Sequence, residues 1–422
     1  MKYIKIYLPI IIFTYFFTFL IGVNTGVYKV FPYELLASAK HTLEDLLQGK
    51  TEQTLFDEGK TSEDSSFSNL WHSIEFDKST KATHESILNN FELRWERVES
   101  DVLGKTGAVS FSKDSVKFVN RDDKTILGLL GLLDKFSSRH DGGIRTIFEV
   151  NGIEYAYVAY VNDECASASI YNLVTYKTVL DFSCLPENPK DPADLVDLNV
   201  TGGAILKTSD NRLLMSTGTP TSFSETNAIR NLAQDDNSYW GKFLELTFTD
   251  DDVSVKVFSK GHRNPQGVFK YGNQIYAVDH GPMGGDEVNI LERGMNYGWP
   301  NQSLGAHYNL NPINKSYGSA VRVEKPLFAF VPSIGISFIG KCPSIYESYY
   351  SPANCLAVSS MRAASLFFIV FDKDNHVLFT EKIEFGSRIR KFQIDENFLI
   401  AVTDFEGVIV GRFFQIKTKG KW

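Results

Sequence analysis

The chain has 422 residues, a length that suits one large domain with an N-terminal appendage. Phenylalanine (32), tyrosine (19) and glycine (31) are frequent, which favours an all-β protein of many short strands joined by glycine turns over a helical bundle. The formal net charge is -8 without a block of like charges, which argues against a nucleic-acid partner, because neutralising phosphates requires clustered lysines and arginines.

The first predicted element is a membrane segment. Residues 6–23 carry no charged side chain over about the length that the core of a bilayer requires. Lys2 and Lys5 precede this run, which predicts a cytoplasmic N-terminus and an exported remainder. We assign residues 1–28 to a signal anchor or a signal peptide; the long run without an Ala-x-Ala cleavage site favours the anchor. The predicted location is therefore membrane-anchored or secreted, with the main domain outside the cytoplasm.

Residues 29–104 are predicted to form a membrane-proximal helix, a linker and the approach to the main domain. Leucines between Leu35 and Leu47 recur at helical spacing, and Gly49 follows them as a stop signal. Residues 50–69 are rich in Ser, Thr, Asp and Glu and contain few side chains to bury, which is typical of a linker.

From residue 105 the pattern changes to short β-prone runs separated by turn signals such as Asp-Gly-Gly and Asn-Gly. Many short strands with regular turns indicate a sandwich, a barrel or a propeller. Over about 310 residues, four-stranded blades of about 50 residues each give about six blades, although no repeat is visible in the sequence. The runs include residues 108–111, 153–161, 212–218, 243–248, 274–280, 365–371 and 408–416.

The four cysteines are Cys165, Cys184, Cys342 and Cys355, and none has the spacing of a zinc or thioredoxin-like site. Pairing each with its neighbour in sequence would close two short loops in an oxidising compartment, which agrees with export. The sequence leaves all three connectivities open.

Three motifs occur in order in the second half of the chain: GHRNPQG at 261–267, HGPMGGDEVN at 280–289 and GMNYGWP at 294–300. Their order and spacing closely resemble the glucose/sorbosone dehydrogenase family. The resemblance covers roughly residues 105–417 and leaves 418–422 as a tail. It implies a six-bladed β-propeller whose top face holds calcium and pyrroloquinoline quinone (PQQ) and oxidises the anomeric carbon of an aldose.

The second motif places Asp286 and Glu287 behind a Gly/Pro turn whose carbonyls cannot all enter a sheet ladder. Hard cations such as calcium take carboxylate and carbonyl oxygens, whereas an isolated turn of this kind is more often a turn with solvated acids. The resemblance implies that the carbonyls of Gly281 and Pro282 hold a calcium ion that bridges to the cofactor. It also implies a second calcium ion on Asp286, Glu287 and the carbonyl of Tyr297.

Cationic and amide side chains are predicted to bind the quinone, because its three carboxylates need guanidinium forks and amide donors. Pro265 and Gly267 interrupt the loop of the first motif and hold its polar groups out of a sheet ladder. Arg388 and Arg390 alternate, so both would face one side of a strand. For any one arginine, a surface ion pair is the alternative. The predicted cofactor set is Arg263, Asn264, Gln266, Arg362, Arg388 and Arg390.

The resemblance fails where catalysis is expected. The family's catalytic histidine, two residues before the first glycine of the TGGA motif, is replaced by Val200, which accepts no proton. His262 and His280 are weak candidates for the base, and structural roles are favoured for both. Thr219 and Ile126 replace two further residues that contact the sugar in the family.

Two hypotheses remain. The first is an exported sugar dehydrogenase-like oxidoreductase that depends on PQQ and calcium and uses another base. The second is a catalytically inactive, calcium-stabilised propeller that binds a glycan, an anion or a protein. An enzyme needs a base within hydrogen-bond reach of the substrate hydroxyl, and a binding module needs none. The sequence leaves the substrate, the electron acceptor and the oligomeric state open.

Overall fold

The computed structural model describes only part of the chain. The predicted anchor (1–28), the membrane-proximal helix and the tail (418–422) lie outside the described residues. No helix in the described part is long and apolar enough to cross a membrane. The described residues belong to one compact unit, Asp64–Trp422. They are 66–68, 79, 81, 83–88, 90–99, 106–111, 115–135, 141–162, 165–186, 196–221, 228–249, 252–307, 311–314 and 322–416.

The all-β prediction is confirmed. Among the described residues, the α-helices are α4 (Lys124–Leu129) and α5 (Ser344–Tyr350), and the remaining elements are two 3-10 turns and antiparallel strands. The first three sheets are β1 (Ser66–Ser68), β5 (Ser115–Asn120) and β4 (Thr106–Phe111); β6 (Gly143–Val150), β7 (Ile153–Asn162), β8 (Cys165–Asn172), β9 (Thr178–Asp181) and β10 (Leu185–Pro186); and β11 (Gly202–Ser209), β12 (Arg212–Thr217), β13 (Lys242–Phe248) and β14 (Val253–Lys260).

The remaining sheets follow the same antiparallel pattern. They are β15 (Pro265–Tyr271), β16 (Gln274–Asp279), β17 (Asp286–Leu291) and β20 (Phe328–Phe330); β21 (Ile336–Lys341), β22 (Asn354–Ser360), β23 (Ser365–Phe371) and β24 (Val377–Glu384); β2 (His84–Leu88), β3 (Phe91–Val98), β27 (Val408–Gln415), β26 (Phe398–Thr403) and β25 (Ile389–Asp395); and the two-stranded β18 (Gln302–Ala306) and β19 (Pro312–Asn314).

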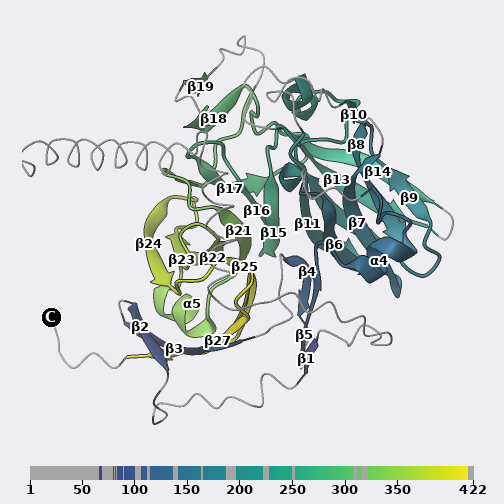
Figure 1. Ribbon diagram of the computed structural model, residues 1–422. Coiled ribbons are helices and arrows are strands. Elements are labelled where there is room, and N and C mark those ends of the chain that lie inside the picture. The colour runs from purple at the N-terminus through teal and green to yellow at the C-terminus, as the bar shows by residue number, and fades with distance from the viewer. Residues whose placement is uncertain are drawn as a thin grey trace, which may run out of the picture. The chain divides into compact units, whose positions relative to one another are not determined.

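One strand from each of the six larger sheets faces a common centre. These inner strands contact one another in the cyclic order β4, β6, β11, β15, β21, β25 and back to β4. In Figure 1 their labels gather at the centre, with the other strands of each sheet outside them. Hydrophobic clusters fill the space between consecutive sheets; one joins Tyr157 to Leu213 and Leu244. The sheets are therefore held by side chains packed face to face.

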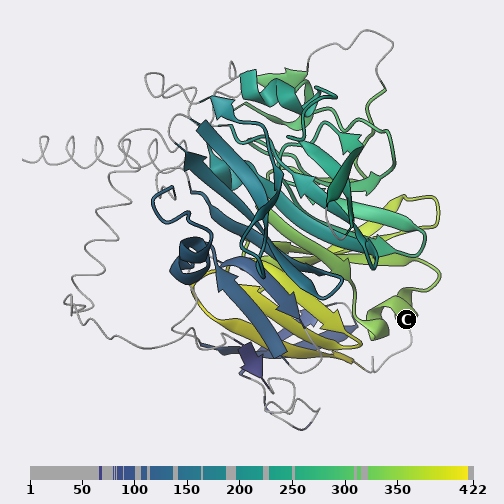
Figure 2. The same ribbon diagram turned by 90° about the vertical axis from the view of Figure 1, so that its right-hand side faces the viewer.

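Strands from both ends of the described chain share one sheet. β3 pairs with β27, with Phe91 opposite Gln415 and Val98 opposite Val408. Figure 2 shows the blue N-terminal strands beside the yellow C-terminal strands. This sheet thus takes β2 and β3 from the range predicted as the approach to the main domain. The linker prediction for residues 50–69 is wrong for residues 66–68, which form β1, because pairing with β5 uses their backbone hydrogen-bonding groups.

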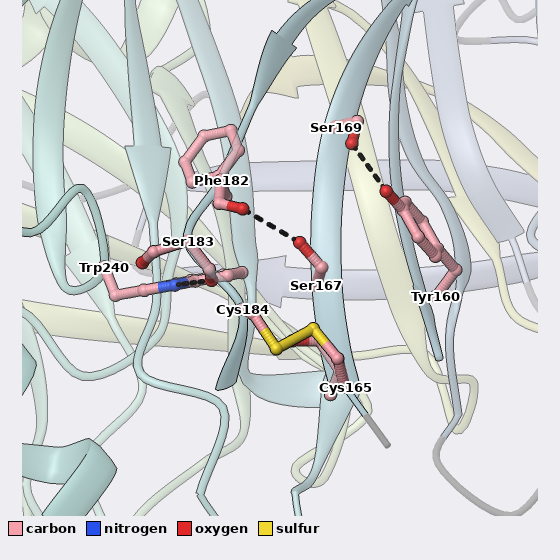
Figure 3. The surroundings of a disulfide bond; sticks show 9 residues. Tyr160, Cys165, Ser167, Ser169, Phe182, Ser183, Cys184 and Trp240 are labelled. Atoms are coloured by element: carbon pink, nitrogen blue, oxygen red, sulfur yellow. Dashed lines mark hydrogen bonds between the residues drawn. A yellow bond between two sulfur atoms is a disulfide. The ribbon is translucent and has the colours of Figure 1, made fainter. Parts of the chain in front are cut away.

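Of the three cysteine connectivities that the sequence leaves open, the structure has the local one: Cys165 bonds to Cys184, and Cys342 bonds to Cys355. The first bond ties β8 to the segment that leads into β10. Beside it, the hydroxyl of Ser167 donates to the carbonyl of Phe182 at 3.0 Å (Figure 3). Each bond closes a loop of fewer than twenty residues, which restricts the unfolded chain.

Candidate functional site

Each of the six inner strands carries a register shift near its start. The shifts bracket Gly107 in β4, Arg145 in β6 and Gln266 in β15. A β-bulge re-aims the side chain of the extra residue. The residues at or beside the six shifts line one cavity, which we call the axial mouth. Its lining is Thr106, Gly107, Arg121, Arg145, Gly202, Gly203, Gln266, Ser337, Arg390 and Lys391.

Two glycines keep the backbone of this mouth compact. A Cβ on Gly107 would lie 2.3 Å from the carbonyl oxygen of Ile144, so no other residue fits there without movement. Gly203 has a φ of 110°, which side-chain-bearing residues rarely adopt. The mouth is therefore shaped by backbone that approaches closely and by the few long side chains around it.

The two predicted cofactor arginines of β25 meet at one carboxylate. Arg390 donates from Nε and Nη2 to Asp404 at 3.2 and 2.7 Å. Arg388 precedes the strand, its side chain is 52% exposed, and its Nε lies 3.7 Å from the same carboxylate. Arg390 lines the mouth and Arg388 flanks it, whereas the exposed Arg362 is not among the lining residues.

The amides of the first motif connect two inner strands. Asn264 accepts through Oδ1 from the backbone N–H of Gly202 at 3.1 Å and from Nε2 of Gln266 at 2.8 Å. Its own N–H donates to Asp279 at 2.7 Å. Asn264 therefore orients the Gln266 amide at the mouth. The side-chain oxygen of Asn264 already accepts two hydrogen bonds.

Arg263 points into a second cavity, the turn pocket. Its Nη1 donates to the carbonyls of His280 and Gly281 at 3.1 and 3.0 Å, and its guanidinium lies over the ring of Trp299. The turn pocket is lined by Gly261, Arg263, Asp279, His280, Gly281, Pro282, Glu287, Tyr297, Trp299, Gln302 and Ser303.

Asp286, predicted as a calcium ligand, has its carboxylate oxygens engaged by the backbone. Oδ2 accepts the N–H groups of Ile334, Gly335 and Ile336 at 3.0, 2.7 and 3.0 Å, and Oδ1 accepts that of Gly281 at 3.0 Å. Burial alone would raise the pKa of Asp286, but His280 and these donors lower it to about 2. The arrangement joins β17 to the start of β21 and leaves no free lone pair for a cation.

Glu287 remains available in the turn pocket. It lies opposite Asp279 in the sheet, and burial together with that neighbouring charge raises its pKa to about 8. Asn289 donates to its Oε2 at 3.3 Å. The phenol of Tyr297 is fixed by the carbonyl of Ile290. Within the described residues, no group of three or more His, Cys, Asp or Glu side chains is close enough to hold a metal ion.

The position that holds the catalytic base in the family is buried in this chain. Val200 is 5% exposed and ends the 3-10 turn Leu198–Val200. His262 is 1% exposed, its Nε2 contacts the hydroxyl of Ser259 at 2.9 Å, and burial lowers its pKa. These contacts support a structural role for His262. His280 lines the turn pocket with Nδ1 3.7 Å from Asp286.

The two altered sugar-contact positions lie away from the mouth lining. Thr219 is fully buried, and its hydroxyl accepts from Trp299 Nε1 at 2.8 Å and donates to the carbonyl of Arg263. Ile126 lies in α4 and packs against a cluster that includes Leu127 and Leu130. Both side chains therefore serve packing in this chain.

A scan against family models matches residues 147–410 to the glucose/sorbosone dehydrogenase model. The chain belongs to this family. Aldose sugar dehydrogenase YliI of Escherichia coli (strain K12) is 36% identical over 125 residues, which are 26% of this chain and 34% of that protein. Quinoprotein glucose dehydrogenase B of Acinetobacter calcoaceticus is 35% identical over 78 residues, 16% of each chain. The matches thus span about a third or less of these relatives.

Solved structures show the fold of the glucose/sorbosone dehydrogenase family over most of the chain. The apo form of soluble aldose sugar dehydrogenase from Escherichia coli matches with a TM-score of 0.57 at 20% identity, covering 76% of this chain and 99% of that one. The PQQ-bound aldose sugar dehydrogenase from Streptomyces coelicolor matches with a TM-score of 0.53 at 18% identity, covering 77% and 98%.

Three cationic residues of the mouth, Arg121, Arg145 and Lys391, were missed by reasoning from the glucose/sorbosone dehydrogenase motifs. Arg121 and Arg145 lie beside the mouth but outside every quoted motif. The ammonium of Lys391 lies 5.8 Å from the ring of Phe338, and burial followed by Arg390 lowers its pKa to about 8. A usable signal existed for Arg145, because it follows Asp-Gly-Gly at the start of a β-prone run, where an inner strand begins.

Proposed function

We propose that this chain is an exported oxidoreductase that uses PQQ and calcium to oxidise a sugar or related alcohol at the axial mouth of a six-bladed propeller. Family membership supports the chemistry, and the ring of six inner strands supports the blade count. The observation that carries the proposal is the set of bulges that brings Gln266 and Arg390 to one mouth beside cationic side chains. The apolar N-terminal segment supports export.

The residues at the mouth fit a polycarboxylate quinone. Guanidinium groups from three separate chain segments line it, and planar anions are matched by such forks. Arg390 and Gln266 would hold the cofactor directly, with Arg388 at the rim and Asn264 fixing the Gln266 amide. When bound, PQQ would supply the acceptor for a hydride, that is, for two electrons and one proton.

Calcium fits the turn pocket only in part. The carbonyl of Gly281 accepts from Arg263 Nη1 at 3.0 Å, so calcium would bind this oxygen only in place of that donor, because a guanidinium and a calcium ion repel each other. Pro282 and Glu287 line the same pocket and add a carbonyl and a carboxylate, the ligand types that calcium prefers. Asp286 does not fit, because four backbone donors engage its oxygens. We therefore restrict the proposed site to Gly281, Pro282, Glu287 and the carbonyl of Tyr297, which also lines this pocket.

The proton acceptor in this proposal is His280 or Lys391. His280 lines the turn pocket with a partly exposed ring, whereas Lys391 lines the mouth itself. A lysine whose pKa is near 8 is neutral in a substantial fraction of molecules at slightly alkaline pH and then accepts a proton. Val200 contributes no base, so turnover of glucose is expected to be slow.

The second candidate function is a catalytically inactive binding module, and one observation favours it. The family's base position is the buried Val200, and the hydroxyl of Thr219 is engaged by Trp299 and Arg263. A site that lost its base and its sugar contacts can still bind an anion or a glycan on the same face.

A quinone titration separates these functions. Full-length protein with calcium is titrated with PQQ while the quinone absorbance is followed, and glucose oxidation is then assayed. We expect a saturable absorbance change in wild type and in Arg293→Met, whose half-exposed arginine pairs with Glu245, and its loss in Arg390→Met. The absence of any change in wild type would overturn the cofactor assignment and favour the binding module.

A further inference from the structure

Two guanidinium groups at the axial mouth are buried with part of their donor capacity unused. Arg121 is 5% exposed and Arg145 is 8% exposed. Arg121 donates through Nη1 to Asn199 Oδ1 at 2.6 Å, and Arg145 donates through Nη2 to the Asn199 carbonyl at 3.1 Å. In the described part of the chain, Nε of Arg121 and both Nε and Nη1 of Arg145 are buried without a hydrogen-bond partner. Buried polar groups in native proteins are normally paired, so these donors point to a missing acceptor.

The nearby carboxylates are bound to other groups. Asp141 accepts from Asn199 Nδ2 at 2.6 Å, and Asp197 accepts from the Asn199 backbone N–H at 2.9 Å. Asp404 is occupied by Arg390. No carboxylate in the described residues accepts a hydrogen bond from either Arg121 or Arg145.

The two guanidiniums also repel one another. Burial, followed by the charges of Arg145 and Arg390, lowers the pKa of Arg121. Burial, followed by Arg390, lowers the pKa of Arg145 to about 10. A negative charge placed between them would reduce this repulsion and accept the unused donors together.

The position of Arg121 and Arg145 indicates which kind of molecule carries the anionic group. Both arginines are anchored on Asn199, the residue before Val200, where the family places its base and hence its substrate. The bulge in β6 directs Arg145, and the Gln266 amide lines the same cavity and suits a hydroxyl-bearing ligand. Gly202 and Gly203 also line this cavity, and they contribute no side chains to their part of its wall.

We propose that Arg121 and Arg145 bind the carboxylate of a small hydroxylated acid at the axial mouth, so that the substrate class is a sugar acid instead of a neutral aldose. The substrate role rests on the proposed function, whereas the binding does not. Arginine suits this ligand because its planar fork matches a carboxylate bidentately. A carboxylate of the quinone cofactor has the same chemistry and is the second source that the experiment must separate.

The test measures anion binding to the full-length protein without quinone, both by calorimetry and by thermal unfolding. Malonate and glucuronate are the carboxylate probes, and glucose and sodium chloride at matched ionic strength are the controls. We expect both acids to raise the melting temperature of wild type, with no response to either control. Arg121→Met and Arg145→Met should weaken malonate binding by about tenfold or more, because each removes charge-assisted hydrogen bonds. Arg293→Met, which removes a surface arginine, should bind as wild type does.

A second readout separates ligand binding from a structural role. Without anion, Arg145→Met should unfold at or above the wild-type temperature, because it removes a buried charge with unused donors. Arg145→Lys, which keeps the charge and loses the fork, should show intermediate affinity. A lower melting temperature of Arg145→Met, with malonate affinity unchanged, would overturn the proposal, as would a wild type that ignores both acids.

The source of the carboxylate is decided by repeating the glucuronate titration with saturating PQQ. Glucuronate binding that persists supports a separate acidic substrate. Glucuronate that is displaced assigns the arginines to a cofactor carboxylate and overturns the sugar-acid class. If the quinone absorbance does not change while malonate still binds, the proposed oxidoreductase fails and the anion site stands.

Discussion

The turn pocket and the axial mouth both hold buried charges, but they use them differently. Beside the turn pocket, next to its lining residue Glu287, Asp286 accepts four backbone N–H groups from two segments of the chain. At the mouth, Arg145 donates to one carbonyl and keeps two buried donors that have no partner among the residues that the structure describes. A charge whose hydrogen bonds are all made within the chain holds the fold together. A charge with donors left over is positioned for something that the chain does not supply.

This difference separates two roles that the sequence could not distinguish. Asp286 belongs to a motif of the family and was predicted to bind calcium, whereas Arg145 belongs to no motif. The structure gives Asp286 a structural role and makes Arg145 a binding candidate.

The largest effect is expected at Val200. A positioned base is typically worth about 10²- to 10⁴-fold in rate, so Val200→His should raise quinone-dependent oxidation by up to this factor if the rest of the mouth is intact. Steady-state kinetics with glucose and glucuronate, at fixed calcium and PQQ, measure the change. Rapid wild-type turnover that does not respond to any substitution of Val200 would show that another residue already supplies the base.

Asp286→Asn should cost about 2 to 4 kcal/mol of unfolding free energy, because the change removes the charge and leaves at least one buried N–H without an acceptor. Urea unfolding measures the loss. Asp395→Asn is the matched control, since its side chain is 66% exposed and 3.9 Å from Lys341. Equal stability of the two variants would remove the structural role assigned to Asp286.

Calcium should stabilise the protein through the turn pocket. An ion at about 100 times its dissociation constant adds about 2.7 kcal/mol to the unfolding free energy, so a chelator should lower the melting temperature of calcium-loaded protein. Glu287→Gln should reduce this response and Asp286→Asn should keep it. The opposite pattern would return Asp286 to the metal site.

The smallest effect concerns pH. If Lys391 is the proton acceptor, it must be neutral to act, so the rate should rise as pH increases through about 8 and level off above that value. Burial, followed by the charge of the neighbouring Arg390, keeps the lysine pKa low. Lys391→Met should abolish this rise, whereas a rise that persists in Lys391→Met and disappears in His280→Gln would assign the base to His280.

The outer strands were predictable because their patterns are local. The run at 365–371 coincides with β23, and the run at 408–416 extends one residue beyond β27. The first is apolar after Ser365, and the second is apolar apart from Gly411, Arg412 and Gln415. The inner strands were harder, because glycine, proline and charged residues at their starts disrupt the alternation that marks a strand. In β15 these are Pro265 and Gly267.

Only those site residues that lie in the family motifs could be predicted from the sequence. The sequence leaves the disulfide connectivity open, and three of the donors that surround Asp286 come from Ile334 to Ile336, 48 to 50 positions away in sequence. Arg121 and Arg145 meet at Asn199 only because three consecutive sheets bring their inner ends together. Such partners leave no local pattern in the chain, so no spacing rule could have identified them.

The most direct test of the contrast between the two regions compares Arg145→Met and Asp286→Asn by thermal unfolding, each with and without malonate. The account predicts that Arg145→Met keeps or exceeds the wild-type melting temperature and no longer responds to malonate, while Asp286→Asn melts lower and responds as wild type does. An Arg145→Met variant that is destabilised and still responds to malonate would contradict the account.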